Sequence, residues 1–264
     1  MCTTEELFQR IDGRKRCSTC KEGDLYCATY VGPLYCAAKD KILFIGLDHG
    51  KGDCVGLQAR QKEMIEWPRR PGKEGKWNPH YRGCVKVASY LLDSACLNDC
   101  TSRCALRASS SPSHTTEAGC VFLQFAQGNA VKCVPPNSPT MRFKGYKRIF
   151  ACLPLMLEEL TVLRPDVIVL QGRSNLYWPL CNLASERGVQ RKTTANCCVD
   201  IMVWPAWQSV IVSLNHPSMG HLKKDWDREI VPALDEARKQ LRASPCGHAP
   251  ADTNYPWSGR SGTL

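Results

Sequence analysis

The chain has 264 residues, a hydrophobic share of 43% and a formal net charge of +10 at pH 7. This composition supports a globular core, and no stretch approaches the roughly 18 uncharged apolar residues of a membrane span. Met1–Arg16 lacks the apolar core of a signal peptide, so we expect a soluble, intracellular protein, cytoplasmic if it is bacterial. The positive charge favours a polyanionic partner such as nucleic acid. In such a chain, 17 cysteines favour thiols and metal ligands over disulfides.

Taken in chain order, four short apolar segments predict buried strands. They are Ile42–Ile45, Val121–Phe125, Val167–Leu170 and Val210–Leu214. Each is rich in β-branched or aromatic residues and is too short for a helix. Their nearly continuous apolarity is typical of parallel strands that are covered on both faces.

Helical patterns lie between and after these strands. One lies within Val85–Leu92, a second has the face Leu153, Met156, Leu157, Leu160 and Leu163 and ends at Pro165, and a third has the face Leu222, Trp226, Ile230, Leu234 and Leu241. Strands that alternate with helices predict an α/β fold, a three-layer α/β/α sandwich around a central four-stranded parallel sheet. We expect residues 1–242 to form a single domain and 243–264 to form a flexible tail.

Four cysteines stand close to the predicted strands, in positions from which they could bind one metal centre: Cys17, Cys20, Cys133 and Cys152. The first two form a C-x2-C motif, the third follows the second strand, and the fourth opens the next helix. Four thiolates suit either zinc or a 4Fe–4S cluster, and spacing alone does not separate these metals. Cys27 and Cys36 are alternative members of the ligand set, and the remaining cysteines are expected to pack as small buried side chains.

The motifs around these cysteines follow a particular order along the chain. They read N-A-V-K-C-V-P-P-N (Asn129–Asn137), C-L-P-L-M-L-E-E-L (Cys152–Leu160), R-P-D-V-I-V-L-Q-G (Arg164–Gly172) and V-I-V-S-L-N-H-P-S (Val210–Ser218). This series resembles the iron–sulfur branch of the uracil-DNA glycosylase superfamily, and the resemblance covers most of Cys17–Ser218. It implies that the four cysteines bind a structural 4Fe–4S cluster, with an N-terminal cluster-binding segment, and that the cluster braces loops facing DNA.

The resemblance also implies two catalytic residues. Asp48, in G-L-D-H-G (Gly46–Gly50), replaces a motif that relatives usually write G-E-A-P-G. It resembles the aspartate of the G-Q-D-P-Y loop in metal-free uracil glycosylases, which positions water and favours the cationic sugar; a turn-capping role is the alternative. His216, in H-P-S, resembles the histidine that hydrogen-bonds the base and stabilises the leaving anion.

Four residues are expected to bind the base after it is flipped out of the helix. Asn129 resembles the base-reading asparagine, since an amide offers both a donor and an acceptor; a turn residue is the alternative. Tyr81, in H-Y-R-G, resembles a phenylalanine that stacks on the base, although it could equally be structural. Gly46 and His49 complete the set, and His49 could contact phosphate, substrate or solvent.

Three residues are expected to contact DNA beyond the base. Met219 could enter the base stack, as apolar side chains of such loops do. Lys223 and Lys144, with basic neighbours at Lys147, Arg148 and Lys224, are candidate phosphate contacts, and each could equally be a solvated charge.

These features predict an enzyme, a monomeric DNA glycosylase that releases uracil or another deaminated or modified pyrimidine and leaves an abasic site. The departures at G-L-D-H-G and at P-P-N-S-P (Pro135–Pro139) leave open a changed substrate, including a modified base of viral DNA. A catalytically weak DNA-binding module that keeps the cluster is a further alternative, and a zinc ribbon on an unrelated α/β domain is the last.

Overall fold

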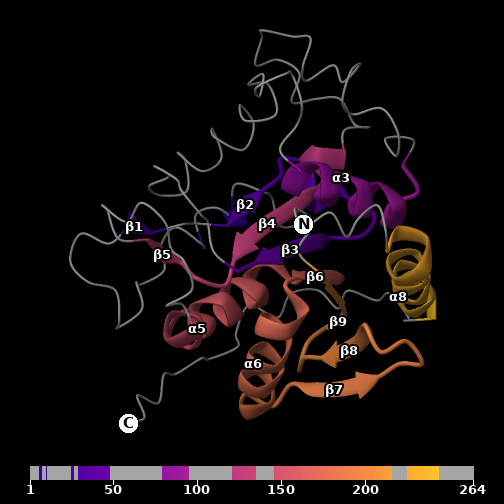
Figure 1. Cartoon of the computed structure of the whole chain (residues 1–264). Helices are drawn as coiled ribbons and strands as arrows, with labels where there is room; N and C mark the ends of the chain where they lie inside the picture. Colours follow the sequence, from indigo (N-terminus) through magenta and orange to yellow (C-terminus); the bar gives the residue numbers. More distant parts are fainter. Residues whose placement is uncertain are drawn as a thin grey trace, which may run out of the picture.

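Among the residues that the computed structural model describes, seven strands form one mixed sheet (Figure 1). The described residues are 6–7, 10, 25–26, 29–47, 79–94, 121–134, 146–215 and 225–243. In spatial order the strands are β2 (Tyr30–Val31), β4 (Phe125–Asn129), β3 (Ile42–Gly46), β6 (Val167–Gln171), β9 (Gln208–Leu214), β8 (Val199–Val203) and β7 (Gln190–Thr193). A separate antiparallel pair is formed by β1 (Leu25–Tyr26) and β5 (Cys133–Val134).

The strands at the centre of the sheet are parallel. β3 runs parallel to β4 and to β6, and β6 runs parallel to β9. The α/β class is confirmed, but the expected four-stranded parallel sheet is not, because the sheet is mixed and wider: β2 joins one edge antiparallel, and β8 and β7 join the other. The added edge strands were not predicted because β2 is two residues long and β7 is exposed throughout. Two residues are too few to show the continuous apolarity of a covered strand, and the residues of β7 are polar.

The second central strand begins later than its apolar segment predicted. Val121–Leu123 forms a short 3-10 turn, and β4 follows it from Phe125. The apolarity of this segment reflects tertiary packing, because Phe122 packs against Tyr30 and Phe125 in the core. β4 therefore ends on Asn129, whereas the sequence predicted that Asn129 follows the strand.

Helices cover both faces of the sheet (Figure 1). α3 (Pro79–Leu91) and α8 (Val231–Ala243) share one apolar cluster with Ile42 and Phe44 of β3. α5 (Tyr146–Leu163) and α6 (Arg173–Glu186) share the other with Leu43 and Ile45. Alternate residues of one strand thus point into opposite layers, as the pleat requires.

The three predicted helices are present in the described part of the chain. α5 ends at Leu163, and Arg164 has a φ of 43° before Pro165. A π-helical turn at Trp226–Ile230 precedes α8, while Leu222 and the expected tail, except Ala243, lie outside the described residues. α6 was not predicted. No helix within the described ranges is both long and apolar enough to cross a membrane.

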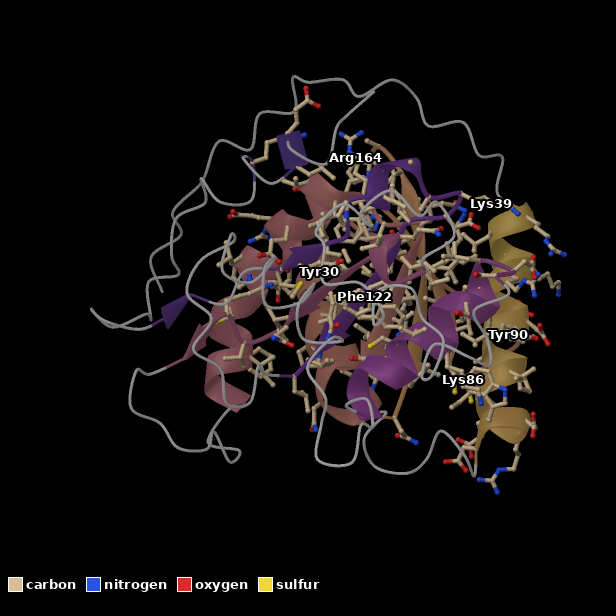
Figure 2. The ribbon with its side chains drawn as sticks, turned by 90° about the horizontal axis from the view of Figure 1, so that it is seen from above. Tyr30, Lys39, Lys86, Tyr90, Phe122 and Arg164 are labelled. Atoms are coloured by element: carbon tan, nitrogen blue, oxygen red, sulfur yellow. The ribbon has the colours of Figure 1, made fainter. Side chains whose placement is uncertain are left out.

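An aromatic and polar contact anchors α3 to the α8 side of the molecule (Figure 2). The Tyr90 hydroxyl donates to Asp235 Oδ1 at 2.6 Å, and this bond is the main reason that the pKa of Tyr90 is raised. The Lys86 ammonium lies 3.6 Å from the centroid of the Trp226 ring, whose plane is nearly perpendicular to that of Tyr90. α3 is therefore held firmly where it supplies a side chain to the site described next.

Candidate functional site

The four parallel strands end in a single row at the carboxyl edge of the sheet. Asn129 is paired in register with Gly46, and Gln171 with Leu214. Gly46 follows directly on Ile45, which is paired with Leu170, so Gly46 lies between Asn129 and Gln171. In open sheets of this kind, ligands bind beyond the carboxyl ends of the strands. The row is therefore the natural place for a site.

Two buried amides approach each other across Gly46. Asn129 and Gln171 are only 3% and 2% exposed. A Cβ atom at Gly46 would lie 2.9 Å from Asn129 Oδ1 and 3.9 Å from Gln171 Oε1. The first distance is shorter than real Cβ contacts, so any side chain at position 46 would force the Asn129 amide to move. The glycine of the G-L-D-H-G motif thus shapes the amide site.

Cys84 of α3 fixes the orientation of the second amide. Gln171 Nε2 donates to Cys84 Sγ at 2.9 Å, which leaves Oε1 on the side of Gly46. Burial raises the pKa of the Cys84 thiol to about 12, against the opposing effect of the Gln171 hydrogen bond. The thiol is therefore neutral at physiological pH. The described part of the site is polar but uncharged, which suits recognition of a neutral, hydrogen-bonding ligand.

A second polar cluster lies on the opposite face of β4. Lys132 Nζ is 2.5 Å from Glu159 Oε2 and 2.8 Å from Thr29 Oγ1, and the Thr29 hydroxyl also donates to Glu159 at 2.5 Å. Both charged side chains are fully buried. A Cβ atom at Gly128 would lie 2.5 Å from Thr29 Oγ1, so this glycine leaves room for the cluster.

This ion pair connects two of the chain segments that carry predicted cluster ligands, the one with Cys133 and the one with Cys152. Lys132 directly precedes Cys133, and Glu159 lies about two helical turns after Cys152, which is buried on α5. β1, which follows Cys20 by five residues, pairs with β5 so that Tyr26 is opposite Cys133. Figure 1 shows β1, β5 and α5 on the same side of the molecule. β1, β5 and α5 therefore lie near one another.

The cysteine ligands themselves are only partly described. Cys17 and Cys20 lie outside the described residues, and of Cys133 the backbone alone is described. Within the described ranges, no group of three or more histidine, cysteine, aspartate or glutamate side chains could hold a metal ion. Among the four predicted ligands, the structure describes the side chain of Cys152 alone.

Cys36 packs against the α5–α6 apolar cluster. It follows Tyr35, whose hydroxyl donates to Leu163 O, at the end of α5 opposite Cys152. Leu163 follows Cys152 by eleven residues, which is about 16 Å along the helix axis. The alternative role of Cys36 as a ligand stays a prediction, because the side chains of Cys17, Cys20 and Cys133 are not described, and Cys27 lies outside the described residues.

The structure describes only part of the predicted pocket. Asn129 and Gly46 are brought into contact, and their base-binding role stays a prediction. Tyr81 lies in the first turn of α3, where its backbone alone is described. The other predicted residues lie outside the described residues: Asp48, His49, His216, Met219, Lys223 and Lys144.

Gln171 and Cys84 are members of the site that the sequence did not reveal. Gln171 ends an apolar strand, and Gly172, with a φ of 131°, turns the chain directly into α6. Such a φ requires glycine. The glutamine before this glycine was the only sign in the sequence that Gln171 could belong to the site. Strand register is needed to show that its amide faces Gly46.

Neither a protein-family model nor a curated protein matches this chain. Fold and site together define a class: an α/β protein with helices on both faces of a mixed sheet and a buried, uncharged amide pair at the carboxyl edge of its parallel strands.

Proposed function

We propose that this protein is a DNA glycosylase of the uracil-DNA glycosylase superfamily, which hydrolyses the N-glycosidic bond of a flipped uracil or related pyrimidine. The observation that carries the proposal is the contact between Asn129 and Gly46 at the carboxyl edge of the sheet. An amide held over a glycine offers a donor and an acceptor to the edge of a base. Gln171 adds a further amide to the same uncharged site.

The predicted catalytic loops start from the same row of residues. Asp48 follows Gly46 by two residues, and His216 follows Leu214 by two. β3 and β9 flank β6, so these strand ends are about 10 Å apart. In the proposed reaction Asp48 orients the attacking water and favours the cationic sugar, while His216 donates a hydrogen bond to the departing base. Tyr81, from α3, provides a stacking face.

The proposal includes a 4Fe–4S cluster that is bound by Cys17, Cys20, Cys133 and Cys152. Support comes from the β1–β5 pairing and the Lys132–Glu159 ion pair, which connect β1, β5 and α5, close in the chain to Cys20, Cys133 and Cys152. The cluster would brace loops that face DNA and would take no part in bond cleavage. Protein purified without oxygen should be brown, absorb near ~400 nm and contain iron and sulfide. Colourless protein with stoichiometric zinc would contradict this part.

Product analysis tests the activity directly. The substrates are single- and double-stranded oligonucleotides, each with one uracil or one other deaminated or modified pyrimidine. Asp48→Asn and His216→Ala should each lower base release at least about 100-fold, as loss of a catalytic proton donor or acceptor does. Lys239→Ala, on α8, is the control and should leave release unchanged. The catalytic assignment fails if neither catalytic variant lowers release.

The same panel separates the alternatives on substrate and activity. The G-L-D-H-G motif favours a pocket that differs from that of the relatives, so release of a modified pyrimidine and not of uracil would identify a glycosylase with altered substrate. Binding of DNA without release of any base would identify a catalytically weak, cluster-bearing module.

A further inference from the structure

An exposed tryptophan lies on α6, far from the amide site. Trp178 is 56% exposed, and within the described residues only one other large hydrophobic side chain, Phe150, is comparably exposed. The ring of Tyr177 lies 5.2 Å from that of Trp178 at an angle of 75°. An exposed indole braced by a second ring offers a flat stacking surface.

Arg191 of β7 lies over these two rings. Its guanidinium carbon is 5.1 Å from the centroid of Trp178 and 6.0 Å from that of Tyr177. Arg191 Nη1 donates to the Tyr177 hydroxyl at 3.1 Å, and that hydroxyl donates to Asp200. Two aromatic rings and the Cys181 thiol, to which it is hydrogen-bonded, thus hold the guanidinium in place, and none of the ion pairs found among the described residues includes Arg191. Its positive charge remains available to an anion.

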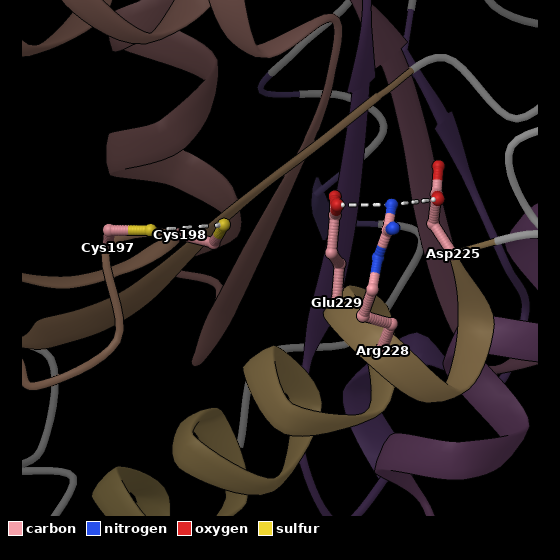
Figure 3. Close-up of polar contacts among 5 residues, drawn as sticks. All are labelled: Cys197, Cys198, Asp225, Arg228 and Glu229. Atoms are coloured by element: carbon pink, nitrogen blue, oxygen red, sulfur yellow. Dashed lines mark hydrogen bonds and ion pairs between the residues drawn. The ribbon is translucent and has the colours of Figure 1, made fainter.

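The cations near and on α8 differ in this respect. Arg228 lies between Asp225 and Glu229, at 2.8 and 2.9 Å (Figure 3). Arg238 pairs with Asp93, and Lys239 with Glu236. Each of these three cations is thus paired with an intramolecular acid, whereas Arg191 lies exposed beside an exposed tryptophan on the α6–β7 side.

This surface lies toward the amino edge of the sheet. α6 joins the end of β6 to the start of β7, where Arg191 is opposite Met202, and Met202 is opposite Ser209 near the start of β9. β7 is four strands away from β3, which is about 19 Å. The surface is therefore outside the amide site and toward the opposite end of the sheet.

We propose that Trp178 and Arg191 form an accessory binding surface for single-stranded nucleic acid. An unpaired base stacks on Trp178, and Arg191 binds the adjoining phosphate. Single strands are bound by this combination of an aromatic platform and a cation, whereas a paired base offers no free face to the indole. This function goes beyond base excision and does not depend on it.

Binding of a fluorescently labelled thymidine 12-mer to the full-length protein, measured by anisotropy, tests the proposal. Trp178→Ala should weaken binding about tenfold, because base stacking on an aromatic side chain is lost, and Trp178→Phe should retain most of the affinity. Arg191→Gln should lower the salt dependence by about one phosphate contact. Lys192→Ala is the matched control, since it removes an exposed cation from the same strand but from its other face.

Unchanged binding by Trp178→Ala overturns the proposal, and so does an equal loss in Lys192→Ala. A loss that is as large for a blunt duplex as for the single strand also overturns it, because the duplex has no unpaired base. The thymidine oligomer contains no uracil. Its binding therefore tests this surface whether or not the protein excises any base.

Discussion

Two polar clusters lie back to back on β4, and they differ in charge. Asn129 faces the α3 layer beside Gly46 and Gln171, whereas Gly128 faces the α5 layer beside Thr29, Lys132 and Glu159. The second cluster is a buried ion pair whose partners hold each other, and breaking such a pair is costly. The first is neutral, and an amide can exchange one hydrogen-bond partner for another at little cost. Burial alone therefore does not separate binding from stability, and charge is the better guide.

The largest effect is expected from Lys132→Met. This change leaves the Glu159 carboxylate buried without its cation, so the free energy of unfolding should fall by about 3–5 kcal/mol, as measured by denaturant titration. Adding Glu159→Leu should restore most of the loss, because no uncompensated charge remains. A single variant as stable as the native protein would show that the pair does not brace the fold.

Asn129→Ala tests the other side of the comparison. Base release should fall about 100-fold, as on removal of one positioned polar contact, while stability changes by at most about 2 kcal/mol. Gln127→Ala is the matched control, because Gln127 is a buried amide on the same face of β4, two residues earlier. It should alter stability more than base release. Equal loss of release in both variants would argue against a specific role for Asn129.

Substitutions of Gly46 and Gly128 should have opposite effects on base release and on stability. Gly46→Ala places a methyl group 2.9 Å from Asn129 Oδ1, so the amide must move and kcat/KM should fall about tenfold with little change in stability. Gly128→Ala instead meets Thr29 Oγ1 at 2.5 Å and should lower stability with a smaller effect on kcat/KM. Measuring the free energy of unfolding and the rate of base release for both variants tests this difference. The same response from both would break the distinction between the two faces.

The smallest change in stability near neutral pH is expected from substitution of Cys84. Because burial raises its pKa to about 12, the folded protein keeps this proton where the unfolded chain, with a thiol pKa of roughly 8.5, loses it. Its contribution to stability is complete below about pH 8.5 and is lost as pH rises toward 12, by up to roughly 1.4 kcal/mol per pH unit. Cys84→Ala should flatten the pH dependence of unfolding above pH 9 by about that slope. Cys181, with a pKa of about 11, is the control and should act over a narrower range.

The central strands and α5 could be predicted because their residues are buried on both faces or along a full stripe. Val167–Leu170 shows this in four consecutive apolar residues, and β6 contains all of them. β7 could not, because the residues of an exposed edge strand resemble those of a loop. In Val121–Leu123 the tertiary packing of a turn gave a strand-like pattern, which displaced the expected strand by four residues.

The candidate site was predictable where a motif marks a residue and not where strand register alone does. Asn129 and Gly46 stand in short motifs, so the sequence named both. Gln171 and Cys84 come from a strand end and a helix far apart in the chain, and only the alignment of β6 with α3 brings Nε2 to Sγ. No local pattern in the sequence predicts this contact between Gln171 and Cys84.

The alternation of Gly128 and Asn129 makes the length of β4 as important as its composition. A strand that slips by one residue turns every side chain to the opposite face. A single insertion or deletion before Gly128 would direct the asparagine amide toward Lys132 and Glu159 and remove it from the row with Gly46. β4 should therefore accept substitutions along its apolar part far more readily than any change in residue number, which would disable binding and bracing in one step.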